Sequence, residues 1–433
     1  MRAFRALLLV CLQASVAAAQ PAASPPQTLL GPTSIDALFD DSVLHDITLN
    51  ISTLDWQMLK VHYLENTYYP ADFRWRTNVV RNIGIKSRGS GSRSGTKPGL
   101  KIDFAKYTTD QTFLGMKSIV LRNNTQDPSG MRERLSMLLF RRMGLQASRE
   151  AHARLFINGE YSGLYTIVEP IDTGYLRRNL GEENGWLYSY EYPPDAAPFY
   201  FDDRGDDPAA YVPVPFTPET KSSDPRPEVI VNWATAVTRT SDAAFRSVMA
   251  GYTDLSRFLR HVAIEAYLGD DDGVLGNWGM NNFYTYRFPG TTQFIILPWD
   301  KSDAFAAGPY GSTWHNITDV APDQQNRLVS RALRYTDLYA TWLNTLQDCV
   351  RITTEVDPDR GDDTGWLERE IEFEYQQIRS AAHADPVAPY SPEQFEQAVE
   401  DLRTFARERG RFVTAEVEAS RTRAGLTRRA TAR

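Results

Sequence analysis

Acidic and amide side chains in the second half of the chain have the composition of a metal and proton-transfer site. They are Asp270, Asp271 and Asp272 in DDDG, Asn281 and Asn282 in MNNFY, and Asp300 in PWDKSD. Carboxylate and amide oxygens are ligands of Mg²⁺. A carboxylate can also orient a hydroxyl group and accept its proton. This combination of residue types indicates phosphoryl transfer, in which a divalent cation neutralises phosphate oxygens.

Asp300 is the strongest candidate metal ligand. It follows the apolar segment FIILPW, and burying a carboxylate there without a cation would be costly. Asp303 is either a second ligand or a turn residue. Asp272 is the candidate base, because it follows an apolar helical segment and precedes a loop with three glycines, GVLGNWGMNN. Glycines allow a backbone to approach a ligand closely.

A glycine-, serine- and arginine-rich segment, RGSGSRSGTKPG, separates two expected strands at residues 79–87 and 100–104. Its position predicts a loop that covers nucleotide phosphates and begins at Arg88, although such loops are often simple flexible turns. Lys101, on the second strand, is expected to contact the phosphates. Lys86 and Lys97 remain alternatives for the same contact.

The next two elements complete the expected nucleotide site. A helix is predicted from about Ser129, as N-cap, to residue 143, and it carries Glu133. Glu133 would pair with a lysine of the site or form a helix-surface ion pair with a neighbouring arginine. A hairpin then turns at Asn158-Gly159 and leads into the extended segment 169–171. There Glu169 and its neighbours are expected to offer backbone groups to an adenine ring.

Strand-like patterning dominates up to about residue 170, and helical patterning follows from about residue 228. The order of elements is a phosphate loop, a lysine strand, a glutamate helix, a hinge, a catalytic loop and a metal-binding aspartate, which is the order in a protein kinase. We therefore expect an α+β, two-lobed, kinase-like fold. The expected parts are a β-rich N-lobe at 43–170, a mainly helical C-lobe at 171–345 and a C-terminal helical extension at 346–433.

The N-terminus predicts export. Residues 1–20 have two arginines, an apolar run and a small-residue zone, as a secretory signal peptide does, and residues 21–42 are expected to be a flexible leader. No later apolar run is long enough for a membrane anchor, so a secreted or periplasmic location is expected. The net charge of −8 argues against nucleic acid as a partner. With only Cys349 after the signal, no intrachain disulfide is expected.

Five segments together resemble the CotH spore-coat kinase family. They are GIKSRGSGSR, KPGLKIDF, LFINGEYSGLYTIVEPID, GNWGMNNFYTYRF and FIILPWDKSDAF, and the resemblance covers roughly residues 43–310. The family implies an atypical protein kinase fold and phosphorylation of Ser or Thr in exported proteins, with ATP and Mg²⁺ or Mn²⁺. By motif, Asp272 matches the catalytic aspartate, Asn281 or Asn282 the metal-binding asparagine, and Asp300 the metal-binding aspartate.

The catalytic segment departs from the family pattern. Better-known members have a compact Asp-Arg-His loop, whereas Gly273 follows Asp272 here and Asn281 lies nine positions further on. Two alternatives to an active kinase therefore remain. One is a kinase-like binding or scaffolding module of an envelope assembly, and the other is a metal-dependent hydrolase that uses the acidic cluster. A serine hydrolase is disfavoured, since no GxSxG motif occurs. The sequence does not determine the oligomeric state.

Overall fold

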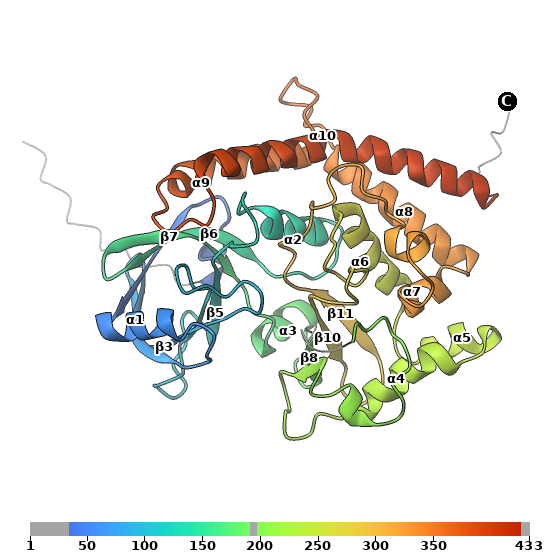
Figure 1. The fold of residues 1–433 in the computed structure, drawn as a ribbon, viewed down its shortest axis with the longest axis horizontal. Helices are drawn as coiled ribbons and strands as arrows, with labels where there is room; N and C mark the ends of the chain where they lie inside the picture. Colours follow the sequence, from blue (N-terminus) through green and yellow to red (C-terminus); the bar gives the residue numbers. More distant parts are fainter. Residues whose placement is uncertain (1–33, 191–196, 426–433) are drawn as a thin grey trace, which may run out of the picture.

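The structure, a computed structural model, describes residues 34–190 and 197–425 and contains two separate β-sheets. The first sheet closes into a barrel, and the second is a four-stranded sheet surrounded by helices (Figure 1). The expected α+β class is thus confirmed, with a β-rich N-terminal part and a mainly helical C-terminal part. The predicted signal peptide at 1–20 and most of the predicted leader lie outside the described residues.

The barrel has the strand order β1-β2-β3-β4-β5-β7-β6, in which β1 and β6 pair in parallel and the other neighbours are antiparallel. Alternate apolar side chains point inward, as Ile47, Leu49 and Ile51 do in β1. The strands are β1 (His45–Ile51), β2 (Tyr69–Trp75), β3 (Asn78–Ser87), β4 (Leu100–Asp103), β5 (Ser118–Arg122), β6 (Glu150–Ile157) and β7 (Glu160–Val168).

Local sequence signals account for much of this part. Asn158 and Gly159 both have positive φ and form the tight β6–β7 turn, as predicted. Two helices accompany the barrel, α1 (Thr53–Val61) and α2 (Arg132–Arg142). Ser129 is not the N-cap of α2, because the helix begins later. Instead, the carboxylate of Asp127 accepts hydrogen bonds from the N–H groups of Ser129 and Arg132, at 2.9 and 2.8 Å.

The second sheet has the strand order β11-β10-β8-β9 and is antiparallel throughout. Its strands are β8 (Trp186–Tyr190), β9 (Phe216–Pro218), β10 (Phe283–Arg287) and β11 (Phe294–Pro298). The helices of this part are α3 (Thr173–Leu180), α4 (Pro227–Arg239), α5 (Asp242–Met249), α6 (Leu255–Leu268), α7 (Arg327–Ala332), α8 (Thr336–Thr353), α9 (Trp366–His383) and α10 (Pro392–Arg423). Three short turns of helix lie at Ile35–Ala37, Pro208–Ala210 and His315–Asp319.

Three apolar clusters hold these elements together. One fills the barrel around Phe73 and Trp75. A larger one joins the helices to one face of the second sheet and includes Leu135 and Phe140 of α2. The third lies between the two sheets and contains side chains of both. Its members are Val120, Val168, Ile171, Tyr175, Leu176, Leu187, Tyr286, Leu297 and Trp299.

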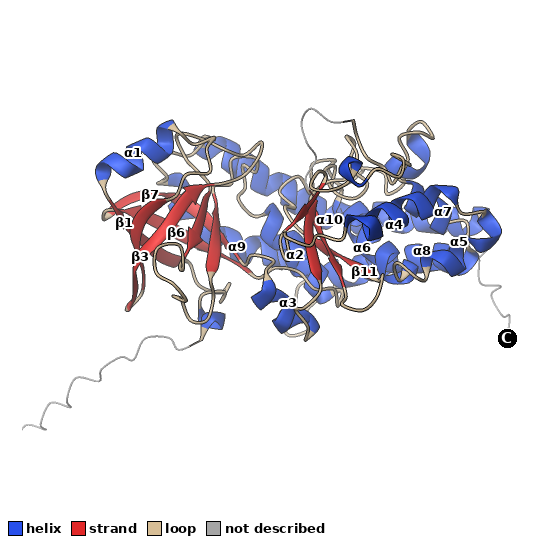
Figure 2. Cartoon of the chain, turned by 90° about the horizontal axis from the view of Figure 1, so that it is seen from below, coloured by secondary structure: helices blue, strands red, loops and turns tan. Residues whose placement is uncertain are grey.

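The last two helices run across both parts of the molecule (Figures 1 and 2). Arg134 of α2, only 2% exposed, donates to Glu370 and Glu374 of α9 at 2.8 and 3.0 Å. Lys97, before β4, pairs with Asp385 after α9 at 2.7 Å. The expected division at residues 345 and 346 falls inside α8. The C-terminal helices therefore contribute buried ion-pair partners to the barrel side.

Across residues 34–190 and 197–425, none of the helices combines the length and the apolar character that crossing a lipid bilayer requires.

The buried ion pairs of Arg134 predict a large loss of stability on substitution. Arg134→Met should lower the free energy of unfolding by about 3–5 kcal/mol, because Glu374 would stay buried without its cation. Arg142 of the same helix is the matched control, since its pair with Glu355 is exposed and Arg142→Met should cost at most about 1 kcal/mol. Urea unfolding measures both changes. Equal losses in the two variants would contradict the prediction.

Candidate functional site

The β10–β11 hairpin brings three predicted site residues together at one end. Phe283 pairs with Pro298, so Asn281 and Asn282 precede β10 where Asp300 follows β11. The N–H of Trp299 donates to the backbone oxygen of Asn282 at 3.2 Å and fastens this end. Asn282 and Asp300 both have positive φ, a conformation that Asn and Asp tolerate better than most residues.

Asp272 lies against both asparagines. The Nδ2 group of Asn281 donates to its two carboxylate oxygens at 3.0 and 3.1 Å, and that of Asn282 donates to one of them at 2.7 Å. Alternation along a strand would point only one of the two asparagines inward. Both contact Asp272 instead, because both precede β10 and Asn282 adopts a positive φ. Asp272, Asn281, Asn282 and Asp300, which the motifs single out, thus lie at one end of the hairpin, and their roles stay predictions.

The barrel supplies the opposite side of the site through Arg122, the last residue of β5. Its Nη1 group pairs with Asp300 at 2.7 Å, and its Nε group pairs with Glu133 of α2. Arg122 and Glu133 are 7% and 6% exposed. The partner of Glu133 is therefore neither a lysine nor a neighbouring arginine of its own helix. Arg122 is not among the residues predicted from motifs, because its two partners, Glu133 and Asp300, come from distant elements.

A small pocket lies beside this ion-pair chain, under the glycine- and serine-rich loop. Arg88, Ser92, Gly99, Arg122, Asn123, Thr125, Asp127, Glu133 and Ser302 are among its lining residues. Asn123 fastens the loop, because its Nδ2 group donates to the backbone oxygens of Ser92 and Lys97 at 2.9 and 2.8 Å. Within the described residues, Nη2 of Arg122 has no hydrogen-bond partner. A buried donor of this kind, beside a pocket, fits an anionic ligand.

The acidic groups of the site influence one another. Burial raises the pKa of Asp272, and the nearby charge of Asp300 adds to this effect against the hydrogen bonds from the asparagines. Burial, with Asp272 and Asp300, raises the pKa of Asp303 to about 6. Burial also acts to raise the pKa of Asp300, but Arg122 and Arg88 outweigh it and lower that pKa. Asp272, Asp300 and Asp303 therefore form one electrostatic group.

This group fits a divalent cation that is shared with a ligand. The described residues contain no group of three or more His, Cys, Asp or Glu side chains arranged to hold an ion alone. Mg²⁺ is commonly held by one or two carboxylates together with phosphate oxygens and water. Asp300, with an amide oxygen from Asn281 or Asn282, supplies ligands of that kind. The residues present thus fit the predicted cofactor.

A buried lysine connects the two loops of the site. Lys301 follows Asp300, is 0% exposed, and contacts Glu265 of α6 at 2.6 Å and Asp270 at 2.9 Å. Burial acts to raise the pKa of Glu265, but Lys301 and His261 outweigh it and lower that pKa to about 2. Gly273 leaves the space that this cluster needs, because a Cβ there would lie 2.6 Å from an Asp270 oxygen. Lys301 and Glu265 were not predicted.

The remaining predicted residues occupy different places. Lys101 is half-buried on the outer face of β4, opposite Val120 of β5 and Lys86 of β3. Lys86 donates to Asn66 at 3.4 Å. Glu169, 3% exposed, pairs with Arg149 at 2.8 Å and also with Arg178. Arg88 lies at the pocket, with its guanidinium 5.7 Å from the ring centre of Trp299.

Lys97 does not face this site. Its ammonium group is buried against Asp385 of the α9–α10 connection, and the same carboxylate accepts the N–H of Leu164 at 2.9 Å. Lys101 and its cross-strand neighbour Lys86 lie on the outer face of the barrel and remain the candidates for phosphate binding. Of the two, Lys101 is also next to β5, whose Val120 belongs to the apolar cluster between the sheets.

Comparisons with known proteins agree with the resemblance. The family model described as CotH kinase protein matches residues 85–413. The inner spore coat protein H of Bacillus subtilis is 22% identical over 333 residues, which cover 77% of this chain and 86% of that protein. Invasin CotH3 of Rhizopus delemar is 25% identical over 254 residues, which cover 54% of this chain and 40% of that protein.

A solved structure, the proinflammatory kinase CtkA of Helicobacter pylori, aligns over 79% of this chain and 95% of its own, at 10% identity. Its TM-score of 0.28 is too low for an argument about the fold. The family match does not depend on that alignment, and it includes both the Arg122–Glu133 pair and the loop of Asp272. Because the match extends over most of its length, this chain belongs to the CotH kinase protein family.

Proposed function

We propose that the protein transfers the γ-phosphate of ATP to Ser or Thr side chains of exported proteins. One observation carries this proposal. Asp272, the two asparagines and Asp300 lie together, and the Arg122–Asp300 contact of 2.7 Å joins them to Glu133 and the glycine-rich loop side of the barrel. Phosphoryl transfer needs this combination of a base, metal ligands and a cation.

Each charged group has a separate role in the proposal. Asp300, with Asn281 or Asn282, would hold Mg²⁺ or Mn²⁺, which supplies positive charge to the phosphate oxygens. Arg122, Arg88 and Lys101 would hold the phosphates from the barrel side. Glu133 orients Arg122 by pairing with its Nε group. Buried arginine is well suited to this task because its fork of donors matches phosphate oxygens.

Asp272 would accept the proton of the attacking hydroxyl group. Its two carboxylate oxygens are held by the asparagine Nδ2 groups, which fixes their orientation. Burial and Asp300 raise its pKa above the ordinary value, which makes the carboxylate a stronger base than an exposed aspartate. The proton leaves the hydroxyl oxygen for the Asp272 carboxylate as that oxygen bonds to the γ-phosphorus, while the bond from this phosphorus to the β–γ bridging oxygen breaks and ADP leaves.

The base of the nucleotide would bind at the apolar layer between the sheets. Val120 and Val168 come from the barrel, and Leu187 and Leu297 come from the second sheet. The neighbouring segment 169–171 has restricted donors, because the N–H of Glu169 already donates to the oxygen of Arg149 at 3.0 Å and Pro170 has no N–H. Ile171 is the nearest remaining backbone donor. Glu169 would then help to position this segment through its pairs with Arg149 and Arg178.

The first test separates binding from transfer. Asp300→Ala should abolish Mg²⁺-dependent ATP binding, because it removes a metal ligand. Asp272→Ala should leave the Kd for ATP nearly unchanged and lower the rate of transfer about 10²–10⁴-fold, the usual contribution of a positioned base. Asp271→Ala is the control within the same loop. Calorimetry measures binding, and ³²P transfer to protein substrates measures turnover.

The outcome of this test also decides between functions. If Asp300→Ala binds and transfers as the parent does, the phosphotransferase proposal is wrong. If the parent binds ATP but transfers phosphate neither to itself nor to any protein supplied, the kinase-like scaffolding function replaces it.

The three lysines make a second test. Lys101→Met should raise the Kd for ATP about tenfold or more, because a hydrogen bond to a charged group contributes about 1.5–3 kcal/mol. Lys86→Met should leave the Kd unchanged. Lys97→Met should also leave it unchanged, while lowering stability through the loss of the buried Asp385 pair. A higher Kd for ATP in Lys97→Met, at temperatures where the variant is folded, would refute the assignment of Lys101 as the phosphate-binding lysine.

The pH dependence of transfer should follow the protonation of Asp272. The carboxylate is the active form and its pKa is raised, so the rate should fall as the pH decreases through that raised pKa. Below the pKa, the loss should approach about tenfold per pH unit, the slope expected for one proton. Transfer measured between pH 4 and pH 8, at saturating Mg²⁺ and ATP, tests this. A flat profile, with circular dichroism confirming a folded chain, would exclude Asp272 as the base.

A further inference from the structure

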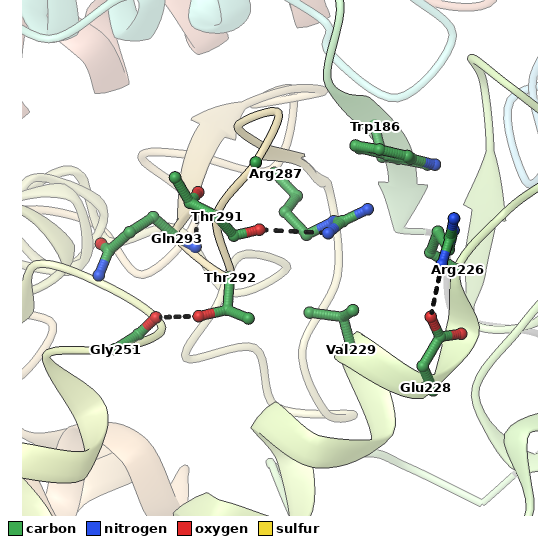
Figure 3. Close-up of a pocket in the computed structure, with 10 residues that line it drawn as sticks. Trp186, Arg226, Glu228, Val229, Gly251, Arg287, Thr291, Thr292 and Gln293 are labelled. Carbon is green, nitrogen blue, oxygen red and sulfur yellow. Dashed lines mark hydrogen bonds and ion pairs between the residues drawn. The ribbon is translucent and has the colours of Figure 1, made fainter.

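A second pocket lies at the other end of the β10–β11 hairpin, away from Asp272 and Asp300. It has a volume of about 670 Å³, and its walls are Trp186 of β8, the first turn of α4 with its preceding residue, and the 290–293 turn between β10 and β11 (Figure 3). From Asn282 to Arg287 the chain covers about 17 Å at the usual rise of a strand. This pocket is therefore separate from the site of phosphoryl transfer.

Arg287 is the central charged group of this pocket. Its guanidinium points into the pocket between Trp186 and Val229 (Figure 3) and lies 3.7 Å from the centre of the indole ring. The residue is only 6% exposed. Nη1 donates to the backbone oxygen of Thr291 at 3.2 Å, and the guanidinium also interacts with the hydroxyl group of Tyr188, whereas Nε and Nη2 have no partner at hydrogen-bond geometry among the described residues. The positive charge is thus met only by neutral groups.

Two further cations lie nearby, Arg226 and Lys221, whose ammonium group is 3.9 Å from the centre of the Trp186 ring. Arg226 pairs with Glu228 at 3.7 Å and with Asp224 at 3.0 Å. Arg287 forms no ion pair with any acidic residue in the described part of the chain. A buried cation without an anion is costly, and the guanidinium fork matches the oxygens of a carboxylate or a phosphate group. This pocket therefore favours an anion, although the chain as a whole carries a net charge of −8.

We propose that Arg287 binds an anionic side chain of the protein substrate, either a carboxylate or a phosphorylated serine, and so docks the substrate away from the reacting hydroxyl. This inference rests on the proposed function, since it names the substrate contact of the same enzyme. An acidic side chain of a protein segment suits the pocket, because its charge complements the buried guanidinium of Arg287. Trp186 and Val229 supply apolar surface for the side chain that carries the anion.

Binding of three labelled peptides, measured by fluorescence anisotropy without ATP, tests the docking site. The peptides share one sequence with an acceptor serine and differ at a distant position, which holds glutamate, phosphoserine or glutamine. The parent should bind one or both anionic peptides at least about tenfold more tightly than the glutamine peptide, a difference of about 1.4 kcal/mol. Whether glutamate or phosphoserine binds more tightly identifies the source of the anion.

Arg287→Gln should abolish the preference for the anionic peptides. Arg246→Gln is the matched control, because it removes the same charge from an exposed pair with Asp337 and should keep the preference. Val229→Glu is a second variant, which offers Arg287 an internal carboxylate and should also abolish the preference without removing the arginine. Val229→Glu replaces Arg287→Gln as the test if Arg287→Gln does not fold.

The possible failures are distinguishable. Equal binding of all three peptides by the parent, or an unchanged preference in Val229→Glu, overturns the docking site while ATP binding and transfer stand. If the preference is present but no phosphate is transferred to any of these peptides or to protein, the anion site stands and the proposed phosphotransferase function fails.

Discussion

Lys301 is buried between two carboxylates, and the geometry of the whole site depends on that contact. Its ammonium group joins Glu265 of α6 to Asp270, in the loop that also carries Asp272. The second oxygen of Glu265 accepts the N–H of Val274 at 2.9 Å, which fixes the far side of the loop. Because Asp300 precedes Lys301 directly, the positions of Asp300 and of the loop that carries Asp272 are set together. Losing one charge of such a cluster would cost about 3–5 kcal/mol.

The two sheets meet at the site through a chain of charges rather than through continuous strands. Asp300 belongs to the second sheet, Arg122 to the barrel and Glu133 to α2, and each contacts the next. Burial raises the pKa of Glu133 to about 7, since burial and Asp300 outweigh the effect of Arg122. Arg122 is thus shared between two acids, and any phosphate that binds it must compete with both. The position of α2 and the occupancy of the site are therefore linked.

Local signals determined which features were predictable. The Asn158-Gly159 turn follows from its turn residues, and the motifs that single out Asp272 and Asp300 are local as well. Arg122 was missed because its partners come from two different elements, and no spacing in the sequence records that meeting. The Lys97–Asp385 pair joins residues 288 positions apart. Because the sequence does not reveal this partner, Lys97 was a candidate for phosphate binding. The C-terminal helices were predicted to be an extension for the same reason, since their contacts with the barrel side are distant in sequence.

The C-terminal ion pairs also constrain when the chain can fold. Arg134 finds Glu374 across 240 positions, and Lys97 finds Asp385 across an even longer interval. Until the ribosome has made those acids, buried Lys97 would have no counter-ion, and Arg134 would keep only its contact with Asp41. Contacts this distant in sequence form slowly, because the entropic cost of closing a long loop comes before the contact gives any stabilisation. A nascent chain that ends before α9 should thus remain open, and folding should be completed only after synthesis reaches the final helices.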